Sequence, residues 1–256
     1  MARTLAVITG ASSGIGAVFA KKLAAEHDLL LIARRKDRLD ALATELRKQF
    51  GTSVEVVAAD LADEQGLALA AERIGATADL GLLINNAGFG AGGYFWEAEL
   101  DRQEEMHRLH VMAVVRLCHV ALKKMVPRNT GGIINVASVA AFVRRPGSTS
   151  YGATKSWMTV FTEGLYLELE AARSAVRVQA LCPGFTYSEF HDAAQLDRAK
   201  LAPRSFWLDA DFVVDESLKG LRRGNLFVIP NWKYKAVAGL LTKLPVAARL
   251  AIERKR

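Results

Sequence analysis

The chain has 256 residues, of which 51% are hydrophobic and 24% charged, so it is long enough to bury a substantial core and is not a disordered chain. Its 34 basic and 27 acidic residues give a net charge of +7, yet no helix-turn-helix, zinc finger or aromatic–basic RNA module accompanies the excess, and nucleic acid is not an expected partner. The two cysteines, Cys118 and Cys182, lie far apart without metal-ligand spacing, which predicts a reduced, cytoplasmic protein with no metal site.

Short apolar runs alternate with longer helical patterns along the whole chain. This alternation indicates repeated β–α units and a parallel sheet, and several runs are apolar throughout, as in strands that helices cover on both faces. No linker, repeat or low-complexity segment divides the sequence. We therefore predict an α/β fold, a single doubly wound Rossmann-like domain over residues 1–256 with a seven-stranded, mostly parallel sheet. The predicted strands are Leu5–Thr9, Leu29–Ala33, Val54–Ala58, Leu82–Asn85, Gly132–Ala137, Val176–Leu181 and Asn225–Ile229, and the predicted helices lie near 15–26, 36–50, 63–75, 97–125 and 150–172.

A glycine-rich turn with the spacing G-x-x-x-G-x-G follows the first predicted strand and opens the first predicted helix. Glycine lets the backbone approach a pyrophosphate closely, and a helix N-terminus adds free N–H groups and a favourable dipole. Glycines also serve ordinary tight turns, but the position between strand and helix favours phosphate binding. The predicted cofactor-binding residues of this turn are Gly10, Ser12, Ser13, Gly14, Ile15 and Gly16.

The residues after the second predicted strand indicate which dinucleotide binds. Arg34, Arg35 and Lys36 stand there, with no acidic residue to hold the ribose hydroxyls of NAD. Cations disfavour a helix N-terminus through the helix dipole, so a solvated helix start explains them less well than a 2′-phosphate does. We predict NADP(H) as the cofactor, with Arg34 and Arg35 among the residues that bind it.

Tyr151 and Lys155 are four residues apart in a predicted helix, and Ser138 precedes Tyr151 by thirteen residues. Positions i and i+4 lie about 5–6 Å apart on one helix face. There an ammonium group stabilises a phenolate and lowers the pKa of the tyrosine. The same pair is common on helix surfaces, so it predicts an acid–base centre only in combination with the glycine-rich turn.

Taken together, these features resemble the short-chain dehydrogenase/reductase family over nearly the whole chain. The joint order and spacing of the matching segments are specific, although each segment alone is modest evidence. The resemblance implies that Asp60 contacts the adenine, that Asn86-Ala87-Gly88 lines the cofactor groove, and that Pro183, Gly184 and Thr186 border the nicotinamide. The matching segments are Thr9–Gly16, Asp60-Leu61, Asn85-Asn86-Ala87-Gly88, Ser138, Tyr151-x-x-x-Lys155 and Pro183-Gly184.

The resemblance also implies a mechanism. A hydride passes between the nicotinamide and a carbonyl or alcohol carbon, Tyr151 transfers the proton, Ser138 binds the substrate oxygen, and Lys155 assists Tyr151 and holds the nicotinamide ribose. We expect an NADP(H)-dependent carbonyl reductase or alcohol dehydrogenase, with an acyl-carrier-protein-linked ketoacyl reductase as one form of it. The rival hypothesis is an NADP(H)-binding regulator or scaffold with weak or lost catalysis. A sugar-nucleotide epimerase is disfavoured by the short C-terminal region.

His110 departs from the family pattern. Family members commonly carry an Asn at this point of the long helix, where it helps to connect the lysine to solvent through water. A neutral imidazole can organise such a water, since one ring nitrogen accepts and the other donates. A histidine satisfied inside the helix explains the residue equally well, so catalytic and structural roles both stay open.

Three segments are expected to surround the substrate. Residues 185–207 form the predicted lid, and the glycine- and aromatic-rich stretch Phe89–Trp96 forms the opposite wall. The C-terminal tail, residues 230–256, combines apolar side chains with many cations. Pro245 interrupts its periodicity, so folding back over the cleft is favoured over lying on an anionic membrane, although peripheral membrane contact stays open.

Apolar stripes on the helices near 97–125 and 150–172 bear on assembly. The family resemblance implies that these helices pair across a two-fold axis in a homodimer or homotetramer. Burial within one chain would produce the same stripes, so the sequence does not decide between them.

Overall fold

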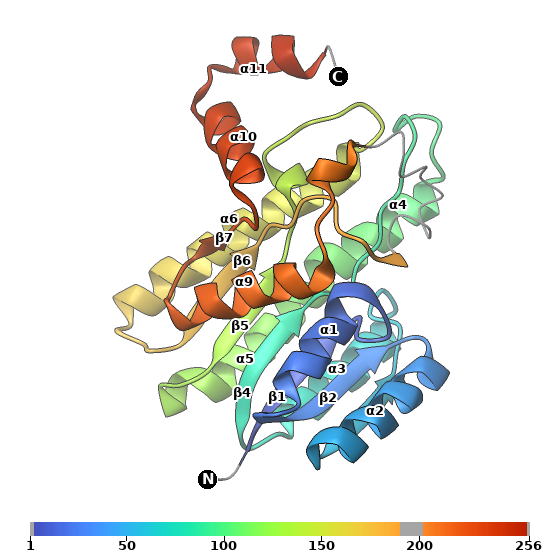
Figure 1. Cartoon of the computed structure of the whole chain (residues 1–256), viewed down its shortest axis with the longest axis vertical. Coiled ribbons are helices and arrows are strands. Elements are labelled where there is room, and N and C mark those ends of the chain that lie inside the picture. Colours follow the sequence, from blue (N-terminus) through green and yellow to red (C-terminus); the bar gives the residue numbers. More distant parts are fainter. Residues whose placement is uncertain (1–2, 190–201, 255–256) are drawn as a thin grey trace.

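Seven parallel strands form one sheet in the order β3-β2-β1-β4-β5-β6-β7 in the computed structural model, which describes residues 3–189 and 202–254 (Figure 1). Every strand predicted from the sequence is present, and every neighbouring pair is parallel. The doubly wound, Rossmann-like fold is therefore confirmed. The strands are β1 Thr4–Thr9, β2 His27–Ala33, β3 Val54–Ala58, β4 Leu80–Asn85, β5 Gly132–Val136, β6 Arg177–Leu181 and β7 Phe227–Val228.

Helices cover both faces of this sheet, and the sheet divides the hydrophobic core into two layers. Alternate strand residues point to opposite faces, so Ile8 and Leu31 pack on the side of α1, α2 and α9, whereas Val7 and Leu30 pack on the side of α3, α5 and α6. Burial on both faces explains why the strands are apolar throughout. The helices are α1 Gly14–Leu23, α2 Lys36–Phe50, α3 Glu64–Gly75, α4 Leu100–His107, α5 Ala113–Arg128, α6 Thr149–Ala171, α9 Ala210–Arg222, α10 Trp232–Lys243 and α11 Val246–Glu253.

The predicted long helix at 97–125 is wrong in one respect. It begins at Leu100 and is interrupted by a π-helical turn, Arg108–Met112, between α4 and α5. A π-turn admits one more residue than an α-turn, which changes the direction in which the following side chains point. His110 lies in this turn and is fully buried.

The C-terminal tail forms two short helices, α10 and α11, on either side of Pro245 (Figure 1). Proline has no N–H and fixes φ, so the first helix ends before it and the second begins directly after it. Within the part of the chain that the structure describes, none of the helices is both long and apolar enough to cross a bilayer.

A buried chain of polar side chains joins β4, β5 and α6. The Asn85 Nδ2 group donates to Asn135 Oδ1 at 2.9 Å, and Asn135 Nδ2 donates to Thr162 Oγ1 at 2.9 Å. Buried amides are costly unless they are hydrogen-bonded, so these bonds specify where α6 sits against the sheet. Because α6 carries Tyr151 and Lys155, the same bonds help to position both residues.

We expect the substitution Asn135→Ala to lower the free energy of unfolding by roughly 2–4 kcal/mol, because it leaves the amide of Asn85 and the hydroxyl of Thr162 without this partner. Urea denaturation followed by circular dichroism measures the loss. Asn225→Ala, at an exposed position, is the control and should change stability by less than about 0.5 kcal/mol. Equal effects of the two substitutions would contradict a structural role for the buried network.

Candidate active site

A cavity of about 850 Å³ opens at the carboxyl ends of the strands, beside the switch point between β1 and β4. In doubly wound sheets the strand order reverses at this point, and the connections after the two adjacent strands lead to opposite faces of the sheet. A crevice that can hold a ligand is left between them. Thr9 ties the two strands together here. Its hydroxyl donates to the Ile84 carbonyl at 3.2 Å and accepts the N–H groups of Asn86 at 2.9 Å and Ala87 at 3.0 Å.

The glycine-rich turn forms the floor of one end of the cavity. Gly10 has φ +66, and a Cβ atom there would lie 2.8 Å from Nδ2 of Asn86. Gly16 is not among the residues that line the cavity; a Cβ atom on it would lie 2.4 Å from the carbonyl oxygen of Gly10. Glycine at these positions therefore lets the turn close tightly, while the N-terminus of α1 faces the cavity with its free N–H groups. This cradle fits a pyrophosphate.

The structure brings the predicted cofactor residues together. With the exception of Gly16, every residue predicted to bind the dinucleotide lines the cavity, and so does Ser138. The lining residues among them are Gly10, Ser12, Ser13, Gly14, Ile15, Arg34, Arg35, Asp60, Leu61, Asn86, Ala87, Gly88, Tyr151, Lys155, Pro183, Gly184 and Thr186. In residues 3–189 and 202–254, no cluster of three His, Cys, Asp or Glu side chains is arranged to hold a metal ion.

Arg35 occupies the cationic corner of this cavity. Its guanidinium donates to the Ser12 hydroxyl at 3.0 Å and to the Ser13 hydroxyl at 2.8 Å, and it pairs with the carboxylate of Glu189 at 2.8 Å. Arg38, one turn further along α2, pairs with the other oxygen of Glu189. These two arginines hold the pKa of Glu189 down, to about 2. The corner therefore already binds one anionic group.

The sequence prediction missed Arg38 and Glu189. Arg38 follows Arg35 by three residues, and helical spacing could have identified it as a neighbour. Glu189 is 154 residues away in the sequence, and no local signal connects it to Arg35.

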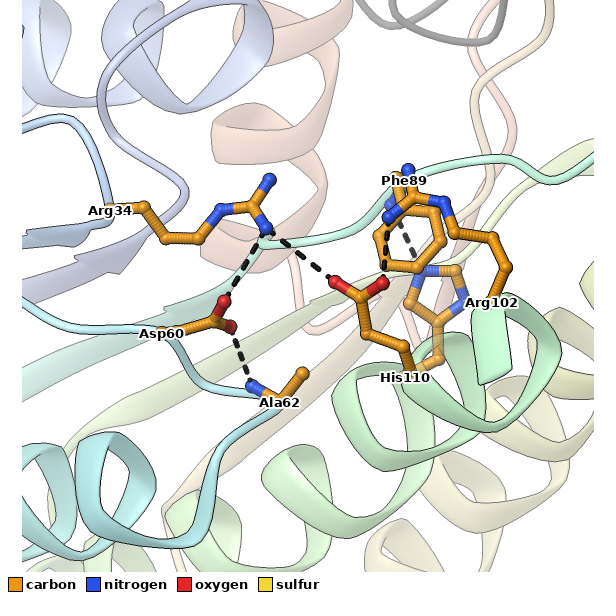
Figure 2. A network of polar contacts seen from close by, with 7 residues as sticks. Arg34, Asp60, Ala62, Phe89, Arg102 and His110 are labelled. Atoms are coloured by element: carbon orange, nitrogen blue, oxygen red, sulfur yellow. Dashed lines mark hydrogen bonds and ion pairs between the residues drawn. The ribbon is translucent and has the colours of Figure 1, made fainter. Parts of the chain in front are cut away.

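Arg34 lies in a different electrostatic setting from Arg35. It pairs with Asp60 at 3.4 Å and Glu105 at 3.5 Å, and Glu105 is also held by Arg102 at 2.7 Å. Figure 2 shows the guanidinium of Arg34 next to the carboxylate of Asp60, and the guanidinium of Arg102 over the ring of Phe89. The charge of Arg34 is therefore largely balanced by neighbours within the protein.

Tyr151 and Lys155 lie on the first turns of α6; Lys155 is buried, whereas Tyr151 is partly exposed where it lines the cavity. Lys155 Nζ donates to the Val136 carbonyl at 2.8 Å and lies 5.8 Å from the centre of the Tyr151 ring. Burial lowers the pKa of Lys155 to about 8. Burial raises the pKa of Tyr151 to about 12, and a hydrogen bond with Ser138 acts in the opposite direction.

This direction corrects the sequence argument, which expected Lys155 to lower the pKa of Tyr151. The cost of burying a phenolate exceeds the stabilising contacts, so Tyr151 is a neutral phenol at neutral pH. Lys155 stays mostly charged at the same pH. The arrangement is suited to a general acid next to a buried cation.

His110 uses both ring nitrogens in hydrogen bonds with the protein. Nε2 accepts the N–H of Phe89 at 3.2 Å, and Nδ1 lies 3.0 Å from the hydroxyl of Thr154. That hydroxyl donates to the Tyr151 carbonyl, so we assign the proton of a neutral imidazole to Nδ1. Burial, aided by the charge of Lys155, holds the pKa of His110 well below its usual range. His110 does not line the cavity, and its contacts favour the structural role over the water relay.

The segments expected to enclose the substrate do so only in part. Phe89 to Gly92 line the cavity, but Tyr94 and Trp96 stack on each other and Trp96 is 77% exposed. In the predicted lid, residues 190–201 lie outside the described part of the chain. Phe185 and Phe206 line the cavity, whereas Tyr187 packs against Trp207.

Tyr234 of α10 is a wall residue that the sequence prediction missed. Its hydroxyl accepts the N–H of Phe185 at 3.1 Å and donates to the Phe206 carbonyl at 2.6 Å. With Val237 and Ala238, it lines the cavity from the C-terminal side. The inner face of α10 therefore covers the cleft, as favoured from the sequence.

Residues 4–199 match the family model of the short chain dehydrogenases. A short-chain dehydrogenase from Sphingobium yanoikuyae, solved in complex with NADPH, superposes with a TM-score of 0.85 at 36% identity, covering 95% of this chain and 97% of that one. The bulky-bulky ketone specific alcohol dehydrogenase from Comamonas testosteroni gives a TM-score of 0.79 at 33% identity, with 95% and 96% covered.

A curated relative is longer than this chain. The very-long-chain 3-oxoacyl-CoA reductase of Anas platyrhynchos is 30% identical over 209 residues, which are 78% of this chain and 65% of that protein. The chain thus spans just under two thirds of that relative's length.

We expect His110→Ala to act on stability more than on proton transfer, because it leaves the Phe89 N–H without its partner and removes the group that donates to the Thr154 hydroxyl. The free energy of unfolding should fall by roughly 2–5 kcal/mol. Thermal unfolding and the pH profile of turnover separate the two roles. A stable variant whose turnover falls at every pH, with an increased solvent isotope effect, would instead indicate the relay.

Proposed function

Because the chain belongs to the short-chain dehydrogenase/reductase family of oxidoreductases, we propose that it is an NADP(H)-dependent reductase that transfers hydride between the nicotinamide and a carbonyl or alcohol carbon. One observation carries the proposal. A single cavity joins a phosphate cradle and a cationic corner at one end to Ser138, Tyr151 and Lys155 at the other. The roles below are proposed for these residues.

Different residues bind different parts of the dinucleotide. The N–H groups at the start of α1 and the backbone around Gly10 hold the pyrophosphate. Arg35, with Ser12 and Arg38, receives the 2′-phosphate in place of the Glu189 carboxylate. Asp60 and Leu61 border the adenine, and Pro183, Gly184 and Thr186 border the nicotinamide. When bound, the cofactor supplies or accepts the hydride.

The reaction centre works best as a carbonyl reductase. Ser138 binds the substrate oxygen, and the neutral phenol of Tyr151 gives it a proton while the carbon gains the hydride. The ammonium group of Lys155, held by the Val136 carbonyl, stabilises the negative charge that the phenol acquires. Tyr151, whose pKa burial raises, is protonated at neutral pH and can therefore serve as this proton donor.

The walls beyond Tyr151 favour a bulky apolar ketone or a 3-oxoacyl thioester. Val139, Val143 and Phe206 line that part of the cavity, and apolar walls of this kind hold apolar substrates. Two relatives are named for ketone and 3-oxoacyl-CoA substrates, in agreement with this class. A cytoplasmic location and a homodimer or homotetramer built on α5 and α6 stay predictions; exposed apolar side chains such as Met112, Val160 and Leu167 support the latter.

We expect Tyr151→Phe to reduce kcat by about 10²–10⁴-fold, because it removes the proton donor, while the Kd for NADPH changes less than about threefold. NADPH oxidation over a panel of bulky ketones and 3-oxoacyl thioesters measures kcat, and fluorescence titration measures Kd. The matched control is Tyr166→Phe, a partly buried tyrosine of the same helix that does not line the cavity and whose hydroxyl bonds to Glu170. Unchanged turnover in Tyr151→Phe would remove Tyr151 from this role. Tight NADPH binding without any turnover in the native protein would support the regulator or scaffold instead.

We expect Arg35→Ala to weaken NADPH binding by about 10–100-fold, the loss of charge-assisted hydrogen bonds to a phosphate, and to leave NADH binding nearly unchanged. Arg34→Ala should weaken NADPH binding less than Arg35→Ala does, because Asp60 and Glu105 already balance the charge of Arg34. Glu189→Gln should strengthen NADPH binding, since it removes the competing carboxylate. Titrations with both dinucleotides measure these effects, and equal weakening of NADH and NADPH by Arg35→Ala would contradict the phosphate role.

A further inference from the structure

The two C-terminal helices carry large apolar side chains that the rest of the described chain does not cover. On α10, Tyr234 and Leu241 are buried against the body, whereas Trp232 is 73% and Leu240 60% exposed. On α11, Val246 is 61% exposed, and Leu250 and Ile252 are exposed as well. Isolated exposed apolar residues are ordinary, but five within 21 positions (232–252) are a concentration.

Cations are interleaved with these apolar groups. Between residues 232 and 254 the sequence has five basic residues and one acidic residue, a net charge of +4 by subtraction. The single carboxylate, Glu253, is buried and accepts the backbone N–H of Arg144 at 2.8 Å. Lys235, Lys243 and Arg254 are exposed, whereas Lys233 donates to the Ser205 carbonyl at 3.3 Å and the Nε of Arg249 is buried. The exposed surface of the segment therefore presents positive charge and no carboxylate. The basic residues are Lys233, Lys235, Lys243, Arg249 and Arg254.

Helix geometry places the two kinds of side chain on one surface. With 100° between successive residues, Trp232, Leu240 and Lys243 fall within about 80° of each other, and Lys235 borders this sector. The buried residues Tyr234, Ala238 and Leu241 fall on the opposite side of α10. A sector of Trp, Leu and Lys is typical of a helix lying in a membrane interface, where lysine stems extend towards headgroups while the ring and aliphatic groups enter the acyl boundary.

The position of this surface relates it to the cavity. α10 and α11 lie at one end of the molecule, away from the N-terminus (Figure 1). Through the bond of Glu253 to Arg144, α11 is tied to the loop that follows β5, and Arg145 of that loop lines the cavity. The inner face of α10 is itself a cavity wall, through Tyr234, Val237 and Ala238. One helix thus separates the cavity from the exposed apolar–cationic face.

We propose that the outer face of α10, with the adjoining exposed side chains of α11, docks the protein on an anionic lipid membrane, with Trp232, Leu240, Val246 and Leu250 entering the interface and the exposed Lys235, Lys243 and Arg254 contacting lipid phosphates. Charge complementarity and the interleaving of apolar with cationic side chains carry the assignment. Binding of an acidic protein would require only the cations of this surface. It would not explain why exposed apolar side chains are dispersed among them. The docking is independent of the proposed reductase function.

Sedimentation of the full-length protein with lipid vesicles tests this inference. Vesicles of phosphatidylcholine with about 30% phosphatidylserine are compared with pure phosphatidylcholine, at about 0.1 M and about 1 M salt. We expect binding at least about tenfold stronger on the anionic vesicles at low salt, and largely lost at high salt.

Two matched pairs of variants locate the surface. Lys235→Glu with Lys243→Glu should weaken vesicle binding by at least about tenfold, whereas Lys48→Glu with Lys123→Glu, which changes the net charge equally at exposed sites, should weaken it much less. Leu240→Ser should weaken binding several-fold, and Leu69→Ser, exposed on α3, should not. Circular dichroism confirms that each variant is folded.

Equal binding to neutral and anionic vesicles, or equal losses in both members of a pair, would overturn the proposal. A change of molecular mass in Leu240→Ser, seen by light scattering without any vesicle binding by the native protein, would assign the face to contact between copies of the chain. Capture by an acidic carrier protein without vesicle binding would overturn it too. Tyr151→Phe should keep full vesicle binding, so failure of the reductase proposal and failure of membrane docking are separate results.

Discussion

The hydroxyl of Thr9 holds the point on which the site depends. It forms hydrogen bonds with the carbonyl of Ile84 and with the N–H groups of Asn86 and Ala87. These bonds join the carboxyl ends of β1 and β4, the point at which the strand order reverses. The glycine-rich turn begins one residue later, at Gly10, and the cavity opens between the two strand ends. Because parallel strands all end at this edge, the phosphate cradle and the residues after β4, β5 and β6 meet in one crevice.

Burial decides the protonation states in this crevice. It raises the pKa of Tyr151 and lowers those of Lys155 and His110, so it disfavours the charged form of each group, although Lys155, with a pKa of about 8, stays mostly charged at neutral pH. Lys155 keeps its charge near neutral pH with help from the Val136 carbonyl, while Tyr151 keeps its proton. His110 becomes a fixed link between the loop at Phe89 and the hydroxyl of Thr154 on α6. The low-polarity surroundings thus place a neutral phenol beside a positioned cation.

The C-terminal helices connect the cavity with the outer surface. Tyr234 bonds to the backbone at Phe185 and Phe206, which makes α10 part of the wall that encloses a substrate. The opposite face of the same helix exposes Trp232 and Leu240 among lysines. An enzyme for apolar carbonyl compounds would gain from such an arrangement, because its substrate partitions into the membrane on which that face would rest.

The sequence by itself determined the seven strands, the glycine-rich turn and the spacing of Ser138, Tyr151 and Lys155. Hydrophobic periodicity and residue spacing are local properties that can be read directly from the sequence. Only the tertiary structure decided which carboxylates pair with each arginine, since the partners of Arg34 and Arg35 are Asp60, Glu105 and Glu189, far away along the chain. It also decided the direction of the Tyr151 pKa, because burial by the surrounding elements outweighs the hydrogen bond with Ser138. The π-turn that buries His110 was likewise beyond the helical pattern, because the periodicity of Leu100–Arg128 accommodates one added residue without an evident break.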